Sequence, residues 1–335
     1  MDQNTIPTLL PRPELGLALA GGAARGFFHI GVLQALAEAG IRPDWYAGTS
    51  AGSVVAACAA GGLSIEDVRR MAGSLSWRKS IVGIKQSAWE MLNAMRAFVT
   101  RDIERTPPGL MENSRIKQTV DAALGGRTFS QIAPLLVTSA DVVTGEEIVF
   151  CSPAVARHLA ERGYPAPRPT GATAWEVRWA PHAVLSPLED VGLAVRCSTC
   201  IPGAMTTVRV ETPDVNGITR RRLLNDGGIV DMCPVRPLRA AGCRKVLAVF
   251  LGLFPRSHDA RHFPGVLMNS GNALASEQIT ASLSAADHVI YDPAIEDVSL
   301  VHLDPRLIDV GYEFTRARIP EIRKGLGLDV VSEAA

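Results

Sequence analysis

Two strand-turn-helix units open the chain, and the first is marked by a change from a continuous to a periodic hydrophobic pattern. Residues 15–20 are all apolar or glycine, as in a strand buried on both faces, and they run directly into a glycine-rich turn at 21–26. Apolar residues then recur at helical spacing over 28–37, and Gly40 follows as a C-terminal cap. This pattern predicts a strand, a tight turn and a helix.

The second unit repeats this order with a sharper turn. Residues 41–47 are a strand candidate, residues 48–52 are Gly-Thr-Ser-Ala-Gly, and residues 53–60 are small and apolar enough for a closely packed helix. Two such units in succession are typical of a mostly parallel sheet with helices on its faces. We therefore expect a three-layer α/β/α domain.

Short hydrophobic runs continue the sheet through the rest of the chain. Residues 135–140, 147–150 and 246–251 have the length and the residue types of buried strands. A turn at Thr144-Gly145 separates the first two of these strands. The same sheet is thus expected to extend well beyond the first two units.

The domain is expected over residues 14–328, between an N-terminal extension at 1–13 and a C-terminal tail at 329–335. Six prolines interrupt residues 151–190, which rules out a long helix or a central strand there. We predict that this proline-rich stretch is an insert in the domain.

Composition and charge exclude several classes of protein. The 335 residues are 47% hydrophobic and 20% charged with a formal net charge of +0, which suits a large core and gives no broad attraction for nucleic acid. No apolar run approaches the roughly 18 residues of a membrane-spanning helix. Residues 1–13 also lack the basic region and apolar core of a secretory signal. We expect a cytoplasmic protein without a transmembrane segment.

The cysteines give no indication of a metal site. Six cysteines are too few for a disulfide scaffold, which agrees with a reducing compartment. Cys197 and Cys200 form a Cys-x-x-Cys pair, but neither a second pair nor a nearby histidine pair accompanies it. No acidic loop has the spacing of a calcium site. The sequence therefore predicts no metal and no cofactor.

A candidate nucleophile lies in the second turn. Gly48-Thr49-Ser50-Ala51-Gly52 matches Gly-x-Ser-x-Gly, in which the serine occupies a strained strand-to-helix turn that only small neighbours permit. The following helix directs its N-terminal amides toward charge that develops near Ser50. The alternative is a tight turn with an ordinary serine at the helix N-cap.

Acyl transfer also needs hydrogen-bond donors for an oxyanion, and the first turn can supply them. Backbone N–H groups in Gly21-Gly22-Ala23-Ala24-Arg25-Gly26 lie at a helix start, where side chains would otherwise block approach. A dinucleotide-binding turn is the competing interpretation, but the turn lacks the spacing Gly-x-Gly-x-x-Gly.

The base is expected to be an aspartate. Asp226, in Asn225-Asp226-Gly227-Gly228, ends a strand-like run and precedes two glycines, so its carboxylate should lie at the end of the sheet where it can approach the serine. A plain Asp-Gly turn is the alternative. The histidines lie in no recognisable catalytic context.

These motifs, in this order, resemble those of the patatin-like phospholipase family. The glycine-rich turn with His29-Ile30-Gly31-Val32-Leu33 behind it is followed by the Gly-x-Ser-x-Gly turn and by Asp226-Gly227-Gly228. Further stretches extend the resemblance over about residues 15–325: Ala140-Asp141 with Thr144-Gly145-Glu146, residues 196–203, and Asp309-Val310-Gly311-Tyr312. The resemblance implies a patatin-like domain and a lipolytic acyl hydrolase.

The resemblance also implies a mechanism. Ser50 attacks an ester carbonyl, Asp226 takes its proton, and an acyl-enzyme forms and is hydrolysed. Backbone amides of Gly21 to Ala23 are implied to stabilise the oxyanion, with Arg25 orienting the loop or meeting an anionic head group. The implied oxyanion and substrate-binding residues are Gly21, Gly22, Ala23, Arg25 and Gly26, and the glycines implied to support the catalytic turns are Gly48, Gly52, Gly227 and Gly228.

Two features depart from the family's pattern. Ala23 stands in the place of a third glycine, and its methyl group narrows the approach to the turn if this position needs a positive φ. Ala204-Met205 stand where an aromatic residue usually follows Pro202-Gly203. Ala204-Met205 and the long insert at 151–190 bear on the choice of substrate.

Two other functions stay open. One is an α/β-hydrolase esterase with a Ser-Asp-His triad, in which His258, His262, His288 or His302 is the base. The other is a non-catalytic lipid-binding protein with the same fold.

A lipid substrate, met at a membrane surface, is the expected partner, and the sequence indicates no oligomeric state.

Residues 77–99 carry an apolar stripe near helical spacing, with two lysines and an arginine among its residues. We predict that this stripe packs against the sheet, with an interfacial cap helix as the alternative.

Overall fold

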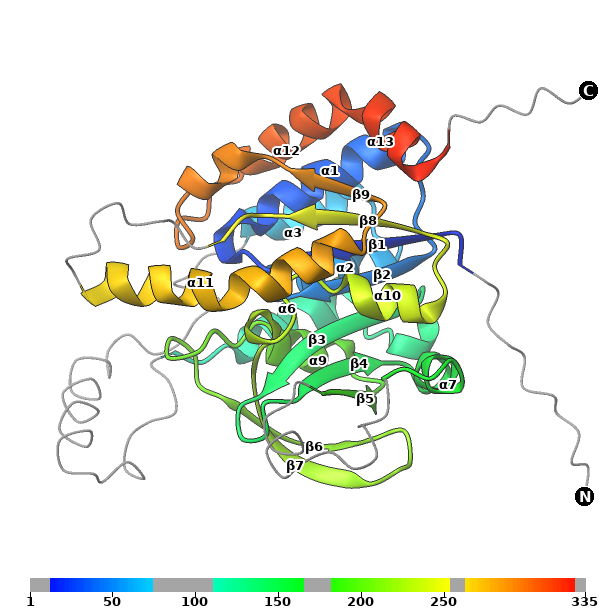
Figure 1. The fold of residues 1–335 in the computed structure, drawn as a ribbon, viewed down its shortest axis with the longest axis vertical. Coiled ribbons are helices and arrows are strands. Elements are labelled where there is room, and N and C mark those ends of the chain that lie inside the picture. The colour runs from blue at the N-terminus through cyan, green and yellow to red at the C-terminus, as the bar shows by residue number, and fades with distance from the viewer. Residues whose placement is uncertain (1–12, 75–110, 166–181, 254–262, 329–335) are drawn as a thin grey trace, which may run out of the picture.

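A single sheet forms the centre of the molecule (Figure 1). The computed structural model describes residues 13–74, 111–165, 182–253 and 263–328. Within these residues the strand order is β5-β4-β3-β2-β1-β8-β9, and β6 and β7 form a hairpin that joins the sheet through β3. The strands are β1 (Leu15–Leu19), β2 (Trp45–Thr49), β3 (Leu135–Asp141), β4 (Glu147–Cys151), β5 (Ala183–Pro187), β6 (Val208–Pro213), β7 (Thr219–Asp226), β8 (Lys245–Phe250) and β9 (His288–Tyr291).

The prediction of a mostly parallel sheet is confirmed. The strands β3, β2, β1, β8 and β9 are parallel to one another, whereas β4 and β7 pair with β3 in the antiparallel sense. Strand β1 is buried along its whole length, as expected for a parallel strand that is covered on both faces.

Helices cover both faces of this sheet, because successive strand residues point to opposite sides. Leu17 and Leu19 of β1 belong to one core, while Ala18 and Ala20 belong to the other. This confirms the three-layer α/β/α architecture. The first core is covered by α1 (Phe27–Glu38), α2 (Ala51–Ala60), α3 (Ile65–Ser74), α6 (Ser114–Leu124), α9 (Val191–Ser198), α12 (Arg306–Ala317) and α13 (Ile319–Leu326), and the second by α7 (Pro153–Glu161), α10 (Val235–Ala241) and α11 (Phe263–Ser284).

Two glycines let α1 and α12 cross in direct backbone contact. A Cβ atom on Gly31 would lie 1.9 Å from the carbonyl oxygen of Ile308, and one on Gly311 would lie 2.3 Å from that of Phe28. No side chain fits at either position, so this crossing depends on both glycines. It fixes α12 against α1, the helix that follows the glycine-rich turn (Figure 1).

Strand β3 determines where the two candidate catalytic residues lie. On one edge of β3, β2 pairs as far as Thr49 with Thr138, and β7 arrives from the opposite direction and pairs Asp226 with Ser139. The residue after Thr49 is Ser50, so both side chains fall at the level of Ser139. The two strands thus run toward each other along the same edge and both end there.

Strand β2 differs from its prediction. It covers Trp45–Thr49, whereas the hydrophobic pattern favoured residues 41–47. The Ile41 N–H bonds to the Leu36 carbonyl and so closes the end of α1. The Asp44 carboxylate accepts a hydrogen bond from the Leu15 N–H at the start of β1. Both residues therefore belong to the connection that precedes the strand.

The described residues of the predicted insert at 151–190 include a helix of nine residues and an edge strand, and neither is the long helix or central strand that its prolines rule out. Helix α7 has Pro153 in its first turn, behind the Ser152 N-cap, where a missing N–H costs little. Strand β5 ends in Pro187 and lies at the edge of the sheet, where proline is tolerated. These two elements extend the sheet and cover one of its faces.

Two further expectations concern membranes. None of the described helices combines the length and the apolar character needed to cross a bilayer. The predicted amphipathic stripe at residues 77–99 lies outside the described residues.

Candidate active site

Ser50 occupies the strained strand-to-helix turn that the sequence predicts. Its φ and ψ are 52° and −126°, a conformation that residues other than glycine rarely adopt, and it lies between β2 and α2. A Cβ atom on Gly52 would lie 2.2 Å from the Leu19 carbonyl oxygen, and one on Gly48 would lie 2.6 Å from the Gly52 carbonyl oxygen. Both glycines are therefore required by the close approach of β1 and α2 to the turn.

Two other serines hold the peptide groups of Ser50. The Ser50 N–H donates to Ser198 Oγ at 2.8 Å, and this hydroxyl donates in turn to the Thr138 carbonyl at 2.6 Å. The Ser50 carbonyl accepts from both the N–H and the hydroxyl of Ser53, at 2.9 and 2.6 Å. Ser198 was not predicted from the sequence, because it is separated from Ser50 by 148 positions and is brought near it only by the fold.

Asp226 lies beside Ser50 at the end of β7. Ser50 Oγ donates a hydrogen bond of 2.5 Å to Asp226 Oδ2, and the Gly228 N–H donates one of 2.8 Å to Asp226 Oδ1. Ser50 and Asp226 are only 6% and 7% exposed. This burial raises the pKa of Asp226 to about 6, although the two hydrogen bonds favour its charged form. The structure therefore brings the predicted serine and aspartate into direct contact in a site that is nearly closed to water.

The two glycines after Asp226 fit the predicted supporting role. A Cβ atom on Gly227 would lie 2.3 Å from the Thr138 carbonyl oxygen, so the loop passes directly over β3. One on Gly228 would lie 3.1 Å from Asp226 Oδ1 and 3.1 Å from the Met232 side chain. Gly227 thus lets the loop cross β3, and Gly228 leaves room for the Asp226 carboxylate.

The glycine-rich turn reaches the nucleophile. A Cβ atom on Gly21 would lie 3.3 Å from that of Ser50, and one on Gly26 would lie 2.7 Å from the Ala51 Cβ atom. Behind the turn, the buried His29 ring binds the Ala20 carbonyl through Nε2 at 2.8 Å. Burial lowers the pKa of His29 to about 4, so this histidine is a neutral support for the start of the turn.

Only some amides of this turn are free to face an oxyanion. The Gly21 N–H donates to the Met232 carbonyl at 3.0 Å, so the expectation that it serves as an oxyanion donor is wrong for this conformation. In the described part of the chain, no acceptor is bonded to the N–H groups of Gly22, Ala23 or Ala51. Ala23 has a φ of 49°, so the position does carry the positive φ that the missing glycine would favour.

The Arg25 side chain is buried and bonds to backbone carbonyls, so its charge does not face solvent. The side chain is 0% exposed, and its guanidinium donates to four backbone carbonyls at 2.7 to 3.0 Å. Two of these acceptors, Leu251 and Leu253, follow β8. The other two are Glu296, in the 3-10 helix η5 (Pro293–Asp297), and Val298, which follows that helix. The head-group alternative is therefore excluded in this structure.

The histidines of the alternative triad make no hydrogen bond with Ser50 in the described residues. His288 lies in β9 and His302 in the loop before α12, whereas His258 and His262 lie outside the described residues. Within the described ranges the Ser50 hydroxyl has one bonded partner, Asp226.

The described residues contain no group of three or more metal-ligating side chains. Both cysteines of the Cys-x-x-Cys pair are buried and free.

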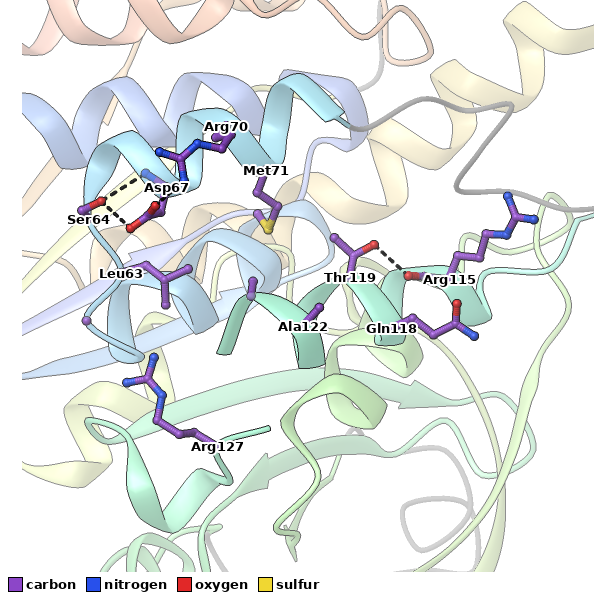
Figure 2. A pocket seen from close by; sticks show the side chains of 12 residues that line it. Leu63, Ser64, Asp67, Arg70, Met71, Arg115, Gln118, Thr119, Ala122 and Arg127 are labelled. Atoms are coloured by element: carbon purple, nitrogen blue, oxygen red, sulfur yellow. Dashed lines mark hydrogen bonds and ion pairs between the residues drawn. The ribbon is translucent and has the colours of Figure 1, made fainter. Parts of the chain in front are cut away.

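A separate cavity lies between α3 and α6 (Figure 2). Its volume is about 840 Å³, and its lining combines apolar side chains such as Leu63 with charged ones that include Asp67, Arg70 and Arg127. It lies beside the C-terminal end of α2, which at 1.5 Å per residue is roughly 15 Å from Ser50. None of the described residues that line it belongs to the predicted site.

Comparison with known proteins assigns the family. A family model described as patatin-like phospholipase matches residues 17–239, which include the glycine-rich turn, Ser50 and Asp226. The chain belongs to the patatin-like phospholipase family.

Curated relatives match parts of longer proteins. An uncharacterised NTE family protein of Mycobacterium tuberculosis is 27% identical over 240 residues, which cover 71% of this chain and 49% of that protein. The lysophospholipase NTE1 of Candida glabrata is 41% identical over 88 residues, which cover 26% of this chain and 5% of that protein. Patatin-like phospholipase domain-containing protein 6 of Mus musculus is 33% identical over 99 residues, which cover 30% and 7%. The chain thus spans about half the length of the mycobacterial relative.

Solved structures resemble the chain more distantly. Human GIVD cytosolic phospholipase A2 has a TM-score of 0.42 and 12% identity, covering 95% of this chain and 62% of that chain. VipD from Legionella pneumophila has a TM-score of 0.41 and 14% identity, covering 93% and 67%. At these TM-scores the likenesses add no support beyond the family match.

Proposed function

We propose that this chain hydrolyses fatty-acyl esters of lipids, with Ser50 as the nucleophile and Asp226 as its base. The observation that carries the proposal is the 2.5 Å hydrogen bond from Ser50 Oγ to Asp226 Oδ2 in a buried site. Membership of the patatin-like phospholipase family supports lipid acyl hydrolysis as the general class of activity.

The proposed reaction has two steps. Ser50 Oγ forms a bond to the carbonyl carbon of the ester while its proton passes to Asp226 Oδ2, and the tetrahedral intermediate expels the alcohol, which takes that proton. A water molecule then attacks the acyl-enzyme, again giving its proton to Asp226, and the fatty acid leaves as the proton returns to Ser50. The contact between the two side chains makes a histidine relay unnecessary.

The free amides around Ser50 are the proposed oxyanion donors. The N–H groups of Gly22 and Ala23 come from the glycine-rich turn, and that of Ala51 comes from the start of α2, where the helix dipole also favours negative charge. Loss of one such donor typically lowers the rate about 100-fold or more. Arg25 contributes indirectly, because it holds the turn in place from behind.

The raised pKa of Asp226 sets the expected pH dependence. Asp226 accepts a proton only while it is ionised, so its pKa of about 6 predicts that hydrolysis falls as the pH drops through 6. A pKa near the working pH is favourable for a base, because the group is ionised before the reaction and still holds a proton well during it.

The decisive experiment compares wild type with Ser50→Ala and Asp226→Asn on a short-chain p-nitrophenyl ester and on a phospholipid mixture. We expect wild type to release fatty acid, and both variants to be folded by circular dichroism and at least about 100-fold slower. Asp214→Asn is the matched control, because Asp214 lies in the β6–β7 hairpin turn and bonds only to that turn. It should keep the wild-type rate.

Other outcomes would favour the two alternatives. Loss of turnover on replacing His258, His262, His288 or His302 with alanine, with the fold intact, would indicate a triad. Binding of phospholipid vesicles without turnover that depends on Ser50 would indicate a lipid-binding protein. A preference for vesicles over the dissolved ester would support the expected membrane surface, and cytoplasmic residence remains a prediction.

A further inference from the structure

We propose that Ser198 is a positioning residue, whose hydroxyl takes the place of one hydrogen bond of the β2–β3 ladder and thereby sets where Ser50 stands relative to Asp226. This inference rests on the proposed function, because it explains how that dyad is aligned. Ser198 is the last residue of α9 and is 0% exposed.

The register of the sheet shows which hydrogen bond is replaced. In β2, the Tyr46 N–H donates to the Pro134 carbonyl, one residue before its partner Leu135. In a parallel ladder this pattern repeats at every second residue. Two repeats further along, which is four residues after Tyr46, an uninterrupted ladder would have the Ser50 N–H donate to the Thr138 carbonyl.

The structure has a serine hydroxyl between these two groups. The Ser50 N–H donates to Ser198 Oγ at 2.8 Å, and Ser198 Oγ donates to the Thr138 carbonyl at 2.6 Å. A hydroxyl can accept and donate at once, so both backbone groups keep a partner although the strand has left the sheet. The inserted oxygen holds the Ser50 nitrogen about 1–2 Å farther from β3 than a direct bond would.

The same end of α9 also holds the base. The Asp226 N–H donates to the Cys200 carbonyl at 2.8 Å, two residues beyond Ser198. Helix α9 is itself anchored, since its N-cap Asp190 is bonded to Lys117 at 2.7 Å. The stretch 198–200 therefore contacts both members of the dyad from one fixed helix end, and a shift of either contact changes the distance between them.

The absence of this hydroxyl has two structural outcomes, and both misalign the dyad. Either the Ser50 N–H and the Thr138 carbonyl stay buried without a partner, or they close up into the ordinary ladder bond. Closing up would pull Ser50 out of its strained conformation and away from the 2.5 Å contact with Asp226. A displacement of about 1 Å in a catalytic group can lower a rate about 100-fold.

The test compares Ser198→Ala with Ser186→Ala in the full chain. Ser186 is the matched control, because it is also 0% exposed and its hydroxyl donates to the Pro213 carbonyl at 2.9 Å, but it lies on β5 away from the dyad. We expect Ser198→Ala to lower kcat for the p-nitrophenyl ester about 100-fold with KM changed less than about 2-fold. Ser186→Ala should keep kcat even if both variants melt at equally reduced temperatures.

A pH profile separates positioning from a general loss of stability. The hydrogen bond from Ser50 lowers the pKa of Asp226, so weakening it should move the acid limb of kcat/KM to higher pH in Ser198→Ala but not in Ser186→Ala. An unchanged acid limb together with an unchanged kcat would overturn the inference.

Two conservative variants keep the test decisive if the alanine variant does not fold. Ser198→Thr retains the hydroxyl but adds a methyl group, whereas Ser198→Cys fits the volume but bonds weakly. Positioning predicts that threonine keeps more activity than cysteine, and the opposite order would refute it. Wild type that is inert on every ester would instead refute the proposed function, so the two failures are distinguishable.

Discussion

Replacement of the proposed base is expected to abolish activity and, at the same time, to stabilise the fold. The pKa of Asp226 is about 6 in the folded chain against an ordinary value of 3.8. One pH unit corresponds to about 1.4 kcal/mol, so the ionised carboxylate destabilises the folded state by about 3 kcal/mol. Asp226→Asn carries no charge and can still bond to the Gly228 N–H and to Ser50, so it should recover most of this energy.

The sign of the effect fixes its pH dependence. Because the folded pKa is raised, the destabilisation is absent below pH 3.8, grows between pH 3.8 and 6, and is complete above pH 6. Urea unfolding of wild type and Asp226→Asn at pH 4 to 8 should therefore show a variant about 2–3 kcal/mol more stable at pH 8 and nearly equal at pH 4. Asp214→Asn should follow wild type throughout. A difference that is absent at pH 8, or constant across the range, would refute the reasoning.

Three further predictions follow from the turns around the site. Ala23→Gly should leave the free energy of unfolding unchanged or raise it by about 1 kcal/mol in urea titrations, because alanine at a φ of 49° is strained; a loss of about 1 kcal/mol would contradict this. Arg25→Lys should lower both the melting temperature and the hydrolytic rate, because lysine cannot reach four carbonyls with one planar group; an unchanged protein would show that the guanidinium is dispensable. Gly52→Ala should abolish folding or activity, since its Cβ atom would lie 2.2 Å from the Leu19 carbonyl oxygen. Gly73→Ala in α3 meets nothing within 4 Å and should be neutral or stabilising by up to about 1 kcal/mol in the same melting assay. Equal effects of the two glycine variants would argue against the steric explanation.

The sequence predicts much of the sheet, because several of its strands are short apolar runs, but it places β2 too early and does not predict β9. Strands β1, β3, β4 and β8 lie close to their predicted positions, and the helix after each of the first two turns is present. Strand β7 was visible only as a short run, because its first half, Thr219 to Arg222, is polar and largely exposed. Its antiparallel pairing with β3 depends on residues more than 80 positions apart and leaves no local signal.

In the candidate site, too, residues in local motifs could be predicted, whereas long-range contacts could not. Ser50 and Asp226 lie in short motifs whose glycines indicate a tight turn, so their positions could be predicted from the sequence. Two other contacts join distant parts of the sequence. The Gly21 N–H bonds to the Met232 carbonyl, and the Ser198 hydroxyl bonds to the Ser50 N–H. No residue pattern near Ser198 shows that its hydroxyl would receive the N–H of the nucleophile.

The edge of β3 that β2 and β7 share, together with the end of α9, sets the spacing of the dyad. Ser50 and Asp226 are 176 positions apart, yet each is placed by a pairing to neighbouring residues of β3, Thr138 and Ser139. The segments between Ser50 and Asp226 other than β3 and residues 198–200 can therefore lengthen, shorten or change sequence without altering the distance between nucleophile and base. A domain built in this way can exchange the loops that select a substrate while its reacting pair stays constant, whereas inserting one residue between Thr138 and Ser139 would separate the pair at once.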